Sequence, residues 1–204
     1  MSMKQYTVSI HLHKMLMHNA QTADPTNVFA KAMKEISGKR KKSEADHEQL
    51  ALIEYEAGLY LNRNREVILP GRLFEALIAE GAKVSKEGKS ALAATIVEND
   101  PTITYDGGPL TVEELKKSAD HKLVVPVKVS TSKIMRTRPM FENVKATFIV
   151  ALQTELANPA QLKRWVEDGL NQRGLGDWRP RYGRGAVTAF EEVKVPNPML
   201  IAAE

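Results

Sequence analysis

The sequence predicts an α+β fold in which helices pack on one face of an antiparallel sheet. Residues 5–16 alternate apolar and polar side chains, which is the period of a half-buried strand, and Val8, Ile10 and Leu12 share one side. The chain then ends in a strand at 144–156, a helix from Pro159 and a second strand at 186–195. A strand-helix-strand crossover of this kind lays its two strands in one sheet.

Between these strands the sequence carries start and stop signals for several helices. The spacing predicts a helix between Pro25 and Gly38, and another after Pro70 that ends at or near Gly81. Pro126, within the β-branched segment 122–139, indicates an edge strand or a bulge. Three further helix starts carry capping residues: Ser43 with Asp46, Thr111 with Glu114, and Asn158 with Pro159.

Composition excludes several classes of protein. With 204 residues and 43% hydrophobic residues, the chain is long enough for one large domain with a buried core. It has no cysteine, so disulfides and thiolate metal sites are ruled out, which fits a cytoplasmic location. No apolar run reaches the length of a membrane span, and we expect no membrane partner. The net charge of +4 is mild, but arginine is concentrated in the last third of the chain.

The segment 174–187, GLGDWRPRYGRGAV, combines glycine, arginine and aromatic residues. Glycine tolerates positive φ and lets another molecule approach the backbone, while the arginine fork fits phosphate. Tryptophan and tyrosine rings are platforms for unpaired bases. We therefore expect this loop to contact single-stranded RNA. It has no Gly-Lys-Ser/Thr sequence, so it is not a Walker loop. The side chains that this chemistry selects are Trp178, Arg181, Tyr182 and Arg184.

A second basic segment precedes the final strand. Lys133, Arg136 and Arg138 lie close together in the sequence, and in an extended segment Arg136 and Arg138 share one face. If this segment lies beside the closing loop, the two form one basic strip that binds a phosphate backbone in a salt-dependent way. The alternative is structural: the aromatic rings fold the loop onto the sheet, and its arginines pair with Glu167, Asp168 or Asp177.

The closing loop resembles the glycine-rich signature of the RAMP superfamily, the repeat-associated RNA-binding proteins of CRISPR systems. Five residues fit its pattern: Gly174, Gly176, Arg179, Gly183 and Gly185. The segment 67–83, VILPGRLFEALIAEGAK, is also similar to a recurrent piece of that superfamily. The resemblance implies a ferredoxin-like or RRM-like domain over residues 1–204, with insertions near 20–58 and 85–120.

The same resemblance implies RNA contacts at these five residues and no cofactor. The expected partners are single-stranded, guide-like RNA and other copies of the chain or CRISPR-type subunits. The resemblance also fits a chain that is a diverged or phage-borne member of the superfamily. Other readings are an interaction or phage structural protein on the same fold, and an inhibitor that mimics a CRISPR subunit.

An enzymatic alternative rests on two histidines. RAMP proteins include ribonucleases that need no metal, and His11 and His13 share one face of the first strand. Histidine suits proton transfer near neutral pH, so the pair supplies an acid and a base for RNA cleavage. The alternative reading is a hydrogen-bonding role at the strand surface. A His-x-His pair also begins some zinc sites, but no third ligand follows at a recognisable spacing, and we expect no metal.

Overall fold

The computed structural model describes residues 3–129 and 131–193, and it confirms the α+β prediction. Its antiparallel sheet has the strand order β2-β4-β1-β5. Helices α3 (Gly71–Ala82) and α6 (Pro159–Asp168) connect these strands in the sequence β1-α3-β2-β4-α6-β5, which is the ferredoxin-like arrangement. The strands are β1 (Met3–Leu16), β2 (Thr95–Val97), β4 (Ser132–Gln153) and β5 (Gly185–Glu192).

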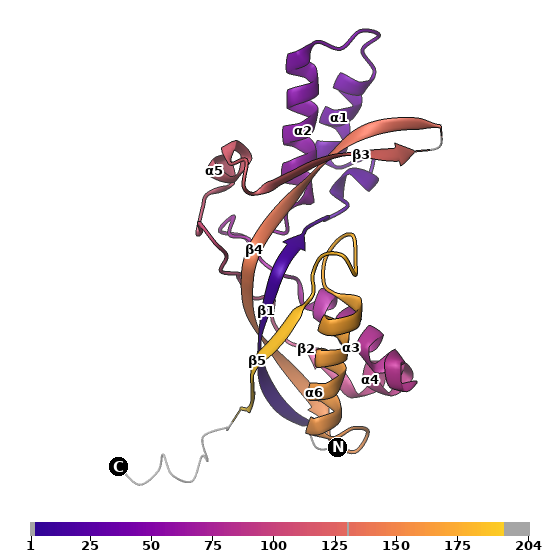
Figure 1. The fold of residues 1–204 in the computed structure, drawn as a ribbon, viewed down its shortest axis with the longest axis vertical. Coiled ribbons are helices and arrows are strands. Elements are labelled where there is room, and N and C mark those ends of the chain that lie inside the picture. The colour runs from indigo at the N-terminus through magenta and orange to yellow at the C-terminus, as the bar shows by residue number, and fades with distance from the viewer. Residues whose placement is uncertain (1–2, 130, 194–204) are drawn as a thin grey trace.

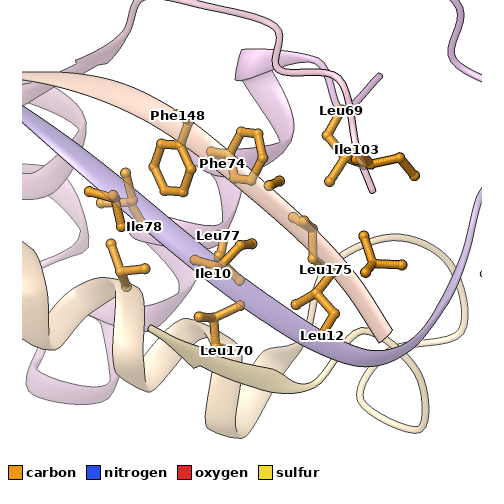
Figure 2. Packing of buried hydrophobic residues seen from close by; sticks show 14 of the residues in the cluster. Ile10, Leu12, Leu69, Phe74, Leu77, Ile78, Ile103, Phe148, Leu170 and Leu175 are labelled. Carbon is orange, nitrogen blue, oxygen red and sulfur yellow. The ribbon is translucent and has the colours of Figure 1, made fainter. Parts of the chain in front are cut away.

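The central strand β1 separates a covered face of the sheet from an open one. Val8, Ile10 and Leu12 are buried against α3 and α6, as their alternation predicts. Figure 2 shows Ile10 and Leu12 packed among side chains of both crossover units. Phe74 of α3 stacks on Phe148 of β4 with ring centroids 4.1 Å apart. Helices α3, α6 and α4 (Gly88–Ala94) thus lie on the same side of the sheet (Figure 1).

Two insertions project from one end of this sheet (Figure 1). Helices α1 (Val28–Ser37) and α2 (Glu44–Gly58) form the first, and the short helix α5 (Val112–Lys117) packs against α2. The second is a hairpin in which β3 (Lys122–Val129) pairs with the first part of β4. The three predicted helix starts at Ser43, Thr111 and Asn158 are confirmed, and each has a capping box. The division into one domain with insertions near 20–58 and 85–120 stays a prediction.

The predicted end of the helix after Pro70 is confirmed to within one residue, because α3 continues past Gly81 only to Ala82. Gly81 also has a packing role that the sequence did not indicate. A Cβ atom on Gly81 would overlap the Trp165 carbonyl oxygen and lie 2.6 Å from the Gly169 nitrogen. The glycine therefore permits the close approach of α3 to α6 and to the π-helical turn that follows it.

This contact gives the first prediction. Gly→Ala within a helix ordinarily stabilises a protein by about 0.5–1 kcal/mol. Overpacking costs about 1–3 kcal/mol, so we expect Gly81→Ala to lower the free energy of unfolding by about 1–3 kcal/mol in urea denaturation. Gly38→Ala is the control, because a Cβ atom there would have its nearest neighbour at 3.3 Å. Equal stability of the two variants would contradict the close packing.

Candidate nucleic-acid interface

The loop that connects α6 to β5 is held against the carboxyl end of β1. The Asp177 amide donates to the Leu16 carbonyl at 2.9 Å, and the Gly183 amide donates to the Lys14 carbonyl at 2.8 Å. At the far end of the loop, the Arg184 carbonyl accepts from the His13 amide at 3.2 Å. The backbone of the loop is thereby fixed to β1, and its long side chains extend from a defined platform.

The glycines of the loop allow its backbone to pack closely against β1. Gly174, Gly176 and Gly183 have φ angles of 77°, 90° and 80°, which favour glycine. A Cβ atom on any of these three, or on Gly185, would collide with backbone atoms of the loop itself or of β1. The expectation that these four glycines present open main chain to a ligand is therefore corrected. They allow the chain to pack against its own backbone.

Four arginines of this segment are exposed: Arg173, Arg179, Arg181 and Arg184. Within residues 3–129 and 131–193, no carboxylate lies within 4.0 Å of their guanidinium groups. The alternative in which the loop arginines form internal ion pairs does not hold for them. Sequence reasoning missed Arg173, although it directly precedes the first glycine of the motif.

The aromatic residues of the loop lie close to these arginines. The Trp178 and Tyr182 ring centroids are 6.3 Å apart at 45°, and the Tyr182 amide donates to the Trp178 carbonyl. Trp178 is 37% exposed, whereas Tyr182 is half-buried. The indole ring is thus the more accessible surface for a stacked base.

A depression of about 490 Å³ lies between this loop and α3. Glu80 on its wall forms an ion pair with Lys83, which is the main cause lowering the pKa of the Glu80 carboxyl; Arg173 and Arg179 lower it further. The guanidinium charges therefore act across the depression. Its lining residues are Glu80, Gln172, Arg173, Gly176, Asp177, Trp178, Arg179 and Pro180.

The two basic clusters predicted from the sequence do meet, but carboxylates neutralise their junction. Arg136 and Arg138 share one face of β4, as expected, and both donate to Oε1 of Glu54 in α2, at 3.2 and 2.7 Å. Arg138 also donates to Asp177 of the loop at 3.0 Å and is only 12% exposed. The Thr137 amide donates to the second Glu54 oxygen at 2.9 Å.

This network corrects the prediction for Arg138. Its guanidinium group joins α2, the hairpin and the loop, and it is not available to RNA. Arg136 is 33% exposed but shares Glu54. Lys133, near the turn of the hairpin, is exposed and has no ion pair among the described residues.

The two histidines of β1 lie on the open face of the sheet. His11 and His13 meet edge to face with ring centroids 5.3 Å apart. Nε2 of His11 is 3.3 Å from the Asn143 side-chain oxygen, and the Asn143 amide nitrogen donates to Asp106 at 2.6 Å. A fixed partner thus exists for His11. The sequence did not indicate it, because turn chemistry alone explained Asp106.

Lys145 is the cation nearest in register to His11. It pairs with His11 across β1 and β4, and it exchanges both backbone hydrogen bonds with Thr104 on its other side. The pair with His11 is therefore of the non-hydrogen-bonded kind, in which Cα atoms are about 4.5 Å apart and side chains are close. The His11 and Lys145 side chains are therefore neighbours on the open face, where both line one depression.

In the part of the chain that the structure describes, no three histidine or acidic side chains are grouped as metal ligands. No helix there combines the length and the apolar character needed to cross a membrane.

Comparison with known proteins shows a likeness in structure. No protein-family model matches the chain, and no curated protein matches its sequence. A chain in the cryo-EM structure of the Type III-B Cmr-beta bound to cognate target RNA is similar, with a TM-score of 0.56 and 10% sequence identity. The match covers 94% of this chain and 61% of that one, so this chain spans about three fifths of its length. The likeness supports the α+β, ferredoxin-like fold.

The Arg138 network gives a prediction that separates structural from exposed arginines. Arg138→Ala leaves Glu54 and Asp177 without their cation, and we expect it to lower the free energy of unfolding by about 2–4 kcal/mol. Arg184→Ala, which removes an exposed and unpaired group, should change it by less than about 0.5 kcal/mol. Urea denaturation of both variants checks this, and similar values for the two would contradict a structural role for Arg138.

Proposed function

We propose that the chain binds single-stranded RNA through the arginine loop, residues 173–184, as a subunit of a CRISPR-type ribonucleoprotein or a phage-encoded relative of one. The observation that carries the proposal is a group of four exposed guanidinium groups on one backbone-anchored loop, none of them ion-paired within the described part of the chain. The similarity to a chain of the RNA-bound Type III-B Cmr-beta supports it.

The proposed mechanism divides the contacts by chemistry. Arg173, Arg179, Arg181 and Arg184 hold phosphate oxygens, each with a planar fork of donors. Trp178 stacks on one base, which must be unpaired to expose its face. Because the loop backbone is hydrogen-bonded to β1, little conformational entropy is lost when RNA binds. Lys133 and Arg136 extend the positive surface onto the hairpin. In a ribonucleoprotein, other copies of the chain or CRISPR-type subunits occupy the same RNA.

Removing two of these charges tests the proposal. We expect Arg179→Ala/Arg181→Ala to weaken binding of a single-stranded RNA at least tenfold, since each lost charge-assisted contact contributes about 1.5–3 kcal/mol. The slope of log K against log salt should fall by about 1.4, at about 0.7 per phosphate contact. Fluorescence anisotropy at several salt concentrations measures both quantities.

The matched control for this test is Arg40→Ala/Arg63→Ala, which removes the same charge from exposed, unpaired arginines outside the loop. It should leave the affinity within about threefold of the parent. RNA binding that ignores ionic strength in the parent protein would instead favour an interaction or phage structural protein.

The hydrogen-bonded position of His11 favours a second candidate function, metal-independent RNA cleavage. His11, oriented by Asn143 and Asp106, would take the proton of a 2′ hydroxyl. The 2′ oxygen then attacks the adjacent phosphorus, the bond to the 5′ oxygen breaks, and His13 protonates that oxygen. The products are a 2′,3′-cyclic phosphate and a 5′ hydroxyl.

Under this candidate, the protein cleaves RNA in the presence of EDTA, and His11→Ala slows cleavage at least a hundredfold, because proton transfer contributes about 10²–10⁴. Thr188→Ala, on the neighbouring strand, is the control. Gel analysis of an end-labelled structured RNA measures the rate, and intact RNA with the parent protein would eliminate this candidate.

A further inference from the structure

A cavity beside the open face is separate from the arginine loop. It lies between the turn at Asp106 and Gly107, the segment before β3, and the middle of β4. Its volume of about 450 Å³ is within the range of small-molecule sites. The lining residues are Asp106, Gly107, Ala119, Asp120, His121, Met140 and Glu142.

His121 is the most unusual group in this cavity. It is 6% exposed, its ring meets Tyr105 edge to face at 5.3 Å, and it lies 5.6 Å from the Phe141 ring. Within the described residues, no hydrogen bond reaches its imidazole. Among the described residues, the fully enclosed polar atoms without a partner are the Tyr6 and Tyr55 hydroxyls, so the His121 imidazole reaches the cavity, where a ligand can bond it.

Gly107 keeps one ring nitrogen of His121 accessible. A Cβ atom on Gly107 would lie 3.5 Å from Nε2 of His121, and larger side chains would cover it. Gly107 has a φ of 77°, which also disfavours other residues. The turn therefore leaves room for a ligand atom next to Nε2.

The carboxylates of the cavity differ in their partners. Asp106 accepts from Asn143 at 2.6 Å, and Glu142 pairs with Lys14 at 2.5 Å. Asp120, at the rim, has no partner among the described residues. The free groups are thus one carboxylate and one imidazole. An ionised carboxylate only accepts hydrogen bonds, so these groups are complementary to a ligand that presents hydrogen-bond donors.

Among the RNA bases, guanine fits this donor requirement best. Its N1–H and N2–H₂ groups are adjacent donors that one carboxylate accepts together, while adenine, cytosine and uracil each offer a single donor group on that edge. Guanine also carries acceptors, O6 and N7, that a protonated ring nitrogen of His121 can reach. The side chain of Met140 supplies an apolar wall.

The neighbouring depression supplies a place for the phosphate. It has a volume of about 560 Å³, crosses the open face and shares Asp106 with the cavity. His11 and Lys145 line it, and Lys145 is exposed without an ion pair among the described residues. A nucleotide with its base in the cavity would place its phosphate near this ammonium group.

We propose that the cavity of Asp120 and His121 binds a guanine nucleotide of the RNA, at a site distinct from the arginine loop. This inference rests on the proposed function for the identity of its ligand. Asp120 accepts from the N1–H and N2–H₂ edge, His121 bonds an acceptor of the base, and Lys145 pairs with the phosphate.

Titration of the full chain with guanosine 5′-monophosphate tests the site, with adenosine 5′-monophosphate as the matched probe. We expect saturable binding of the guanine nucleotide by calorimetry and at least tenfold weaker binding of the adenine nucleotide. Asp120→Asn should weaken guanine binding at least tenfold, and the exposed control Glu191→Gln should not change it. Because Asp120 is exposed, its substitution should leave the thermal unfolding midpoint unchanged.

The outcomes separate this site from the arginine loop. Arg179→Ala/Arg181→Ala should bind the guanine nucleotide as the parent does, even though its RNA affinity falls. Equal binding of the two nucleotides, or no effect of Asp120→Asn, would overturn the proposal. Binding of arginine amide that depends on Asp120, with no guanine binding, would overturn it in favour of a partner protein's guanidinium group. Unchanged RNA affinity in the arginine double variant would contradict the proposed function of the loop, and it would leave the guanine site untouched.

Discussion

The docking of a glycine-containing loop onto the carboxyl end of β1 is the constraint on which the candidate interface depends. Backbone hydrogen bonds to Leu16 and Lys14 hold the loop, and they form only because Gly176 and Gly183 bring main chain against main chain. The core fixes β1 in turn, because its apolar side chains are buried under α3 and α6. The positions of the exposed arginines therefore follow from packing that extends through the whole sheet.

Ion pairing divides the arginines into two groups with different physical roles. Arg138 lies between Glu54 and Asp177 and holds three segments together, at a site where little water reaches the charges. Among residues 3–129 and 131–193, Arg179 and Arg181 have no such partners, and their donors are free. Net charge cannot distinguish these groups, because each arginine contributes the same formal charge. The positions of the carboxylates decide which of them can meet a phosphate.

Local signals predicted much of the fold, because alternation and capping act within a few residues of sequence. The strand 5–16, the helix starts at Ser43 and Asn158, and the edge position of Pro126 all follow from such signals. The packing role of Gly81 could not be predicted, because the backbone that it contacts, at Trp165, is 84 positions away in the chain and no local pattern reveals it. The partnership of His11 with Asn143, and the pairing of Arg138 with Glu54, depend in the same way on strand register and on how an insertion folds back.

The arginine loop lies at the rim of the sheet and borders both of its faces. On the covered side, Arg173 and Arg179 border the depression against α3. At the other end of the loop, the Arg184 carbonyl is bonded to His13, whose ring lies on the open face beside His11. Under the proposed function, an RNA strand bound by the loop would lie at the rim of the sheet, and its next nucleotides would follow β1 onto the open face. There the side chains are polar and hydrogen-bonding, and the exposed Lys145 lies opposite His11, so this face is chemically suited to the RNA that we propose for the loop.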